Sequence, residues 1–186
     1  LLFDLQPKEA IKEWEKSKDL GAGFATVYRN LGVGYNMTYN DLKKSMTFYE
    51  KAVELNPYDS RVILELDDVY RKAQEPHAKR LAMLQKYHDN IIKSNYLLPF
   101  EREIELYTIM GQYDKALEMM KGYHFRRWEG GANVYTSFLD ANLLRGMELM
   151  KVKKVILYTM RHVPMLWKMM PYGSMFLPDR VLMAGL

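Results

Sequence analysis

The chain of 186 residues contains no cysteine. It therefore has no disulfide framework and no thiolate ligand for a metal ion. This composition favours the cytoplasm without excluding an exported protein, so the compartment stays open. The sequence also lacks an apolar run that approaches the roughly 20 residues of a membrane-spanning helix. We therefore expect no membrane span.

The chain has little excess charge of either sign. Its 27 basic and 23 acidic residues leave a net charge of +4 with neutral histidines. Domains that bind nucleic acid usually concentrate basic residues on one face or in one stripe, and this sequence has no long run of one sign. The composition thus argues against a nucleic-acid partner.

Residue patterns typical of catalysis are sparse. The four histidines are far apart in the sequence, and none is paired with another at the helical spacing that a metal site needs: His77, His88, His124 and His162. The acidic pairs Asp67-Asp68 and Glu101-Glu105 are expected on solvated helix faces, where the pKa of a carboxyl group shifts little. The glycine-rich segments lack the lysine and hydroxyl residue of a phosphate loop. We therefore predict no catalytic residues, no metal site and no cofactor.

The stretch from Ala25 to Pro57 has the periodicity of two successive helices. The first helix carries Tyr28, Leu31, Gly32 and Tyr35 on one face, and the second carries Ser45, Tyr49, Ala52 and Val53. The residue types of this stretch come in a fixed order: an aromatic residue, Leu-Gly, a tyrosine, a small residue, a second aromatic residue, an alanine and a final proline. This order resembles the tetratricopeptide repeat.

Other segments repeat the pattern with variations. Pro7 to Leu20 has the rhythm of a second helix, and Ile63, Leu66 and Tyr70 restate the first helix, with Asp67 in place of Gly32. A helix is expected from Pro76 to about Ser94, with its apolar stripe on Leu81, Leu84, His88 and Ile91. A third unit begins at Pro99 and turns at Gly111 to Leu117, and a fourth begins near Val134. Gly32, Asp67, Ile104 and Gly146 mark the units at separations of 35, 37 and 42 residues, against about 34 for the repeat.

These units predict an all-α fold, a right-handed α-α solenoid of tetratricopeptide-like helix pairs. Residues 1-151 would form a half repeat and about four units, within what we expect to be a longer parent chain. Residues 152-186 are rich in methionine and proline, and three prolines prevent one long helix there. This segment is interpreted as a cap or an incomplete repeat, or as a contact between copies of the chain.

Several short strings resemble a narrower family. They are Tyr28 to Gly32, Glu65 to Asp67, Gly111 to Leu117, His124-Phe125 with Trp128 to Gly131, and Leu144 to Met150. The repeat region of large bacterial proteins that carry a DUF5107 domain is similar, although Arg126-Arg127 and Ala132 depart from its pattern. The upstream domains of such proteins resemble sugar-processing folds. The resemblance therefore implies a carbohydrate-related setting.

A solenoid of helix pairs presents its first helices along a concave groove. The groove candidates follow each aromatic marker by one and five positions or lie nearby: Arg29, Val33, Asn36, Leu64, Asp68, Arg71, Glu101 and Glu105. Their mixed charge suits a mixed-charge peptide or a polar ligand, although they could equally be solvated walls. A clamp for a terminal carboxylate is not expected, because Val33 and Glu65 replace the two asparagines that such a clamp needs.

The insertion between the third and fourth units offers a second candidate site: His124, Arg127, Trp128 and Glu129. Trp128 could stack on a sugar while Arg127 and Glu129 bind hydroxyl groups. Alternatively, Trp128 fills a gap between units and Glu129 caps the next helix.

Two functions follow from these patterns. The leading hypothesis is a noncatalytic interaction module that binds a partner protein or another domain of its own parent chain. The alternative is a carbohydrate-handling protein in which the Trp128 loop completes a sugar site formed with an upstream domain.

Overall fold

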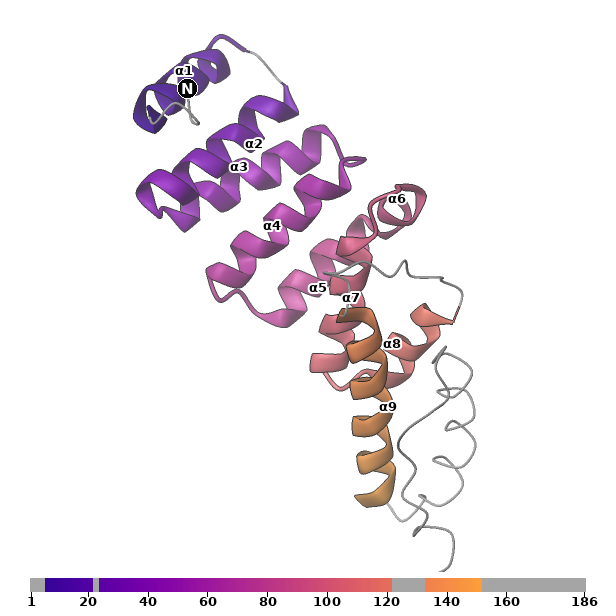
Figure 1. Ribbon diagram of the computed structural model, residues 1–186. Coiled ribbons are helices and arrows are strands. Elements are labelled where there is room, and N and C mark those ends of the chain that lie inside the picture. Colours follow the sequence, from indigo (N-terminus) through magenta and orange to yellow (C-terminus); the bar gives the residue numbers. More distant parts are fainter. Residues whose placement is uncertain (1–5, 22–23, 122–132, 152–186) are drawn as a thin grey trace, which may run out of the picture. The chain divides into compact units, whose positions relative to one another are not determined.

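The computed structural model describes residues 6–21, 24–121 and 133–151, and these residues form helices and no strand (Figure 1). The helices are α1 (Pro7–Asp19), α2 (Ala25–Gly34), the π-helix η1 (Tyr35–Tyr39), α3 (Leu42–Leu55), α4 (Ser60–Lys72), α5 (His77–Lys86), α6 (His88–Lys93), α7 (Leu98–Ile109), α8 (Tyr113–Met120) and α9 (Asn133–Lys151). The prediction of an all-α chain is confirmed for the described residues.

The hairpin of α2 and α3 is held by a close approach at Gly32. A Cβ atom at this position would lie 2.6 Å from Cδ2 of Tyr49, so only glycine lets the tyrosine ring reach the backbone of α2. The Ser45 hydroxyl donates a hydrogen bond of 2.8 Å to the Gly32 carbonyl. Leu31, Tyr49 and Ala52 are buried, as their spacing predicts.

The π-helix η1 accommodates the extra residue of this unit. A π turn contains one residue more than an α turn, and the unit that runs from Gly32 to Asp67 is one residue longer than the ideal repeat of about 34. The turn ends at Asn40, whose φ of 50° is left-handed. Asp41 then starts α3 by accepting a hydrogen bond of 3.0 Å from the amide of Lys44.

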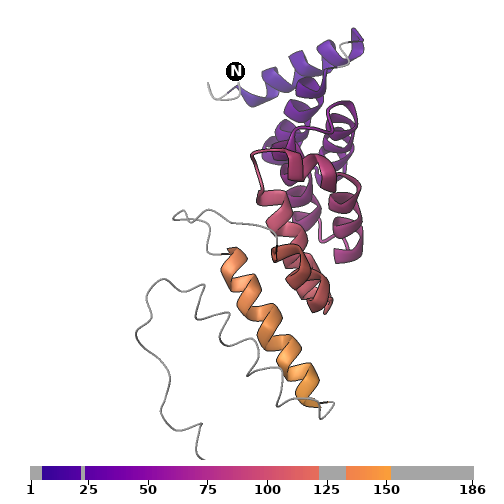
Figure 2. The ribbon, with the colours of Figure 1, turned by 90° about the vertical axis from the view of Figure 1, so that its right-hand side faces the viewer.

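The first helices of successive hairpins are in register. Arg29 of α2 contacts Glu65 of α4, and Asn36 of η1 contacts Lys72 of α4, both at a separation of 36 residues. Two contacts with the same separation require that α2 and α4 run in the same direction. Figure 2 shows these helices from a second side.

The prediction of one helix from Pro76 to about Ser94 is wrong. The segment forms α5 and α6, which are separated at Tyr87 (φ −110°, ψ 10°). The break lets Ile91 enter the core while His88 turns to the side of α7, where its Nδ1 lies 2.8 Å from Oε2 of Glu103. Burial of Glu103 raises the pKa of its carboxyl group. His88 therefore has a partner, but its side chain is 37% exposed and is not a core residue.

The third hairpin, of α7 and α8, has the predicted turn. Gly111 adopts a left-handed φ of 72°, and Ala116 is fully buried in the contact between the two helices. The chain then divides into two compact parts between Ala141 and Asn142, inside α9. Phe138 and Ala141 belong to the core of the first part. The predicted boundary at residue 151 remains a prediction.

Replacing Gln74 with glycine should stabilise the chain. Gln74 follows the C-cap of α4 with a φ of 57°, and the amides of Gln74 and Glu75 donate to the carbonyls of Arg71 and Tyr70 in a Schellman motif. Because a left-handed conformation costs a non-glycine residue about 1 kcal/mol, Gln74→Gly should raise the free energy of unfolding by about that amount. Urea denaturation measures the change. The control Ala73→Gly, at a φ of −78°, should give no gain.

Candidate functional site

A groove of about 590 Å³ opens between α2 with η1 on one side and α4 on the other. It is lined by Arg29, Val33, Asn36, Met37, Tyr49, Glu65, Asp68, Val69, Arg71 and Lys72. We call this the α2–α4 groove. Tyr49 and Val69 are buried and form an apolar floor, whereas Arg71 and Lys72 are exposed. The structure thus gathers five of the eight predicted groove residues around one hollow.

The other predicted site residues lie elsewhere. Leu64, Glu101 and Glu105 do not line the α2–α4 groove. Burial raises the pKa of the Glu101 carboxyl group, so the expectation of an unshifted carboxylate on a solvated face is wrong there. The loop candidates all lie outside the described residues: His124, Arg127, Trp128 and Glu129.

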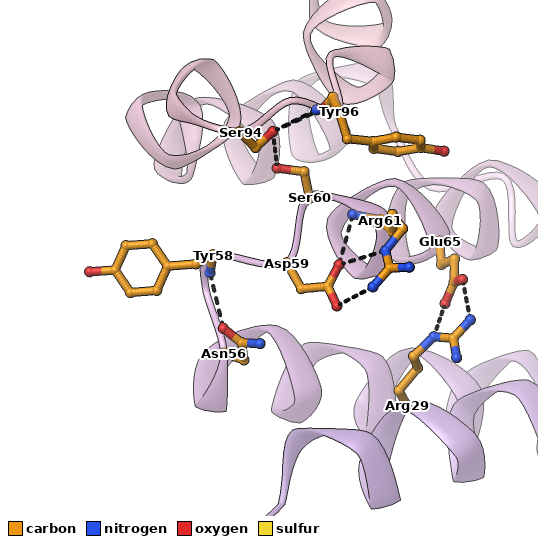
Figure 3. Close-up of polar contacts among 9 residues, drawn as sticks. All are labelled: Arg29, Asn56, Tyr58, Asp59, Ser60, Arg61, Glu65, Ser94 and Tyr96. Atoms are coloured by element: carbon orange, nitrogen blue, oxygen red, sulfur yellow. Dashed lines mark hydrogen bonds and ion pairs between the residues drawn. The ribbon is translucent and has the colours of Figure 1, made fainter.

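Arg29 and Glu65 form a bidentate ion pair across the groove (Figure 3). Nε of Arg29 donates to Oε2 of Glu65 at 2.7 Å, and Nη2 donates to Oε1 at 2.5 Å. The hydrogen bond to Glu65 raises the pKa of Arg29. Burial and then the Glu65 charge raise the pKa of the Tyr49 hydroxyl beneath the pair. In the sequence, the repeat spacing identifies Glu65 only as the residue that replaces an asparagine of the carboxylate clamp. Its pairing with Arg29 becomes evident only from the register of α2 and α4.

Two cations lie at the opposite end of the groove, next to η1. Nζ of Lys72 donates to Oδ1 of Asn36 at 2.8 Å, and Nη2 of Arg71 donates to Oδ1 of Asp68 at 2.9 Å. Both cations belong to the last turn of α4, where positive charge interacts favourably with the helix dipole. The groove therefore carries the neutral ion pair of Arg29 and Glu65 at one end and two exposed cations, Arg71 and Lys72, at the other.

A buried ion-pair cluster fixes α4 against α5 and α7. Arg80 donates to both carboxylate oxygens of Asp67, at 2.8 and 2.7 Å, and Nε of Arg102 lies 3.3 Å from Oδ2 of Asp67. Arg102 also contacts Asp68 and Glu105. Asp67 is fully buried, so its predicted place on a solvated face is wrong. Arg80 follows Asp67 by 13 residues, just as Ser45 follows Gly32 by 13 residues. The ion pair therefore takes the position that the Ser45–Gly32 hydrogen bond has in the hairpin of α2 and α3.

A second, smaller hollow of about 380 Å³ lies between α1, η1 and α3. Its wall includes Thr47 and the stacked rings of Tyr35 and Phe48, whose centroids are 5.4 Å apart. None of its lining residues lines the α2–α4 groove. Its residues therefore provide a reference surface for a test of binding in the α2–α4 groove.

The chain matches no protein-family model. Among the residues that the structure describes, no three histidine or acidic side chains are placed together to hold a metal ion. The helices of residues 6–21, 24–121 and 133–151 include none that is both long and apolar enough to span a bilayer.

Proposed function

We propose that the chain is a noncatalytic interaction module built as a right-handed solenoid of tetratricopeptide-like helix pairs. Its partner is a protein segment or another domain of the parent chain, and it binds in the α2–α4 groove. The observation that carries this proposal is the groove itself. An apolar floor lies between two parallel helices in register, and charged side chains surround it. Such a surface offers packing to a bound segment and fixes its orientation.

Three local features support the tetratricopeptide interpretation. Gly32 accepts the ring of Tyr49, a small residue follows at Ser45, and Gly111 makes the predicted left-handed turn. The third hairpin continues the series with a separation of 34 residues between Asp68 and Arg102. Charged side chains therefore link α4 to α7 as they link α2 to α4, at separations of 34 and 36 residues.

Selection from a phage-displayed library of random 12-residue peptides tests the proposed function. Met37 lines the groove and is 72% exposed, so Met37→Glu should leave the fold intact. It should lower the affinity for the selected peptides at least tenfold. Leu20→Glu is the matched control, because Leu20 is 88% exposed and lies outside the groove. Peptides that bind both variants and the wild type equally would place binding elsewhere and contradict the proposal.

A further inference from the structure

The end of the α2–α4 groove at Arg29 is electrostatically satisfied. Glu65 meets the guanidinium of Arg29 with both carboxylate oxygens, and Arg61, near the start of α4, is held by Asp59 at 3.3 Å (Figure 3). A bidentate pair is among the strongest arrangements available to an arginine. An acidic group of a partner would have to displace Glu65 to reach Arg29. This end therefore disfavours a carboxylate.

The end of the groove at η1 has a surplus of positive charge. Arg71 shares Asp68 with Arg102, whereas the contact of Lys72 is the uncharged amide of Asn36. Three separate groups of contacts carry these charges: Arg29 with Glu65, the arginines Arg71, Arg80 and Arg102 with Asp67, Asp68 and Glu105, and Lys72 with the uncharged Asn36. The first two groups each contain as many acidic as basic residues. The surplus of one positive charge falls at Lys72.

An apolar contact is available beside this surplus. The π-helix η1 carries Met37 into the groove wall, one residue after Asn36, and Val33 lies one turn earlier. Met37 is 72% exposed, and its flexible thioether adapts to side chains of different shape. A side chain next to a carboxylate at Lys72 would therefore meet an apolar surface.

We propose that the α2–α4 groove selects a protein segment with one acidic residue beside an apolar residue. Lys72 and Arg71 bind the carboxylate, Met37 and Val33 contact the apolar side chain, and Glu65 blocks a second acidic residue at Arg29. This inference rests on the proposed function and adds the charge pattern of the partner. Its basis is charge complementarity between a single surplus cation and a single carboxylate.

Synthetic peptides from the library selection test the inference. Each carries a C-terminal amide, so that the side-chain carboxylate is the acidic group measured. Replacing that residue with its amide counterpart should weaken binding to the wild type about fivefold, the effect of one partly exposed ion pair. The loss should be smaller in Lys72→Met, where only Arg71 remains to bind the carboxylate. A second acidic residue at the Arg29 end should improve binding about fivefold in Glu65→Gln and not in the wild type.

The outcomes separate this inference from the proposed function. Selected peptides without acidic residues, or an amide analogue that binds the wild type as well as its parent, would overturn the charge pattern. The proposed function would survive that result if Met37→Glu still weakened binding. If the library yields no peptide that is sensitive to Met37→Glu, the groove is not the binding surface and both fail. Thermal denaturation of each variant checks that folding is unchanged.

Discussion

Replacing Arg80 with methionine should lower the free energy of unfolding by about 3–5 kcal/mol, the usual cost of removing one partner of a buried ion pair. Asp67 is fully buried and receives two hydrogen bonds from Arg80. Methionine keeps the length of the apolar stem, so the loss reports mainly the lost pairing of the Asp67 carboxylate with Arg80. Arg102, at 3.3 Å, is the remaining cation beside Asp67 in the described cluster. Urea denaturation, followed by circular dichroism, measures the change.

A double variant serves as the control for this effect. In Asp67→Leu with Arg80→Met, apolar side chains of similar size replace both charges, and such replacements are often neutral or stabilising. The double variant should therefore recover most of the stability that Arg80→Met loses. A loss below 1 kcal/mol in Arg80→Met would contradict the buried pair, because a hydrated Asp67 would not require its partner.

Replacing Gly32 with alanine should lower the free energy of unfolding by about 2–3 kcal/mol, at the upper end of the cost of overpacking a core. The added Cβ would lie 2.6 and 2.8 Å from Cδ2 and Cε2 of Tyr49, which is only 4% exposed. The ring cannot move aside freely because Tyr49 belongs to the buried core cluster. The α2–α3 hairpin would have to open slightly, and the loss is measured by thermal and urea denaturation.

Gly146 is the matched control, since it is also helical but nothing lies within 4 Å of a Cβ built there. Gly146→Ala should therefore leave stability unchanged or raise it by up to about 1 kcal/mol, through better helix propensity. Adding Tyr49→Leu to Gly32→Ala should relieve the clash and recover stability. Leucine is the residue at the corresponding position of the next hairpin, Leu84. Equal stabilities of Gly32→Ala and the wild type would show that α2 and α3 are not in contact at this glycine.

Local patterns in the sequence predicted the helices and the first hairpin well. The spacing of Leu31, Gly32, Tyr49 and Ala52 predicted which side chains are buried, because helical periodicity and residue size determine which face packs. Gly111 predicted a turn because few other residues adopt a left-handed φ easily. Five of the residues predicted along the first helices line the α2–α4 groove, and their role in binding remains a prediction.

Features that depend on contacts between distant helices were missed. The sequence predicted a solvated position for Asp67, because its partner Arg80 lies on another helix. The pair is recognised only once the alignment of α4 with α5 is known. The π turn at η1 and the break at Tyr87 each change the chain path by a residue or two, and such small shifts leave the hydrophobic periodicity almost unchanged. The pairing of Arg29 with Glu65 likewise required the register of α2 and α4.

The most direct test of the central claim, that the α2–α4 groove is the binding surface, is an NMR titration of the 15N-labelled chain with a peptide from the library selection. The largest amide shift changes should fall on the groove residues of α2, η1 and α4, including Val33, Met37 and Lys72. Amides near Thr47, in the second hollow, should shift little. Changes centred on that hollow or on α8, with the groove amides unmoved, would contradict the account.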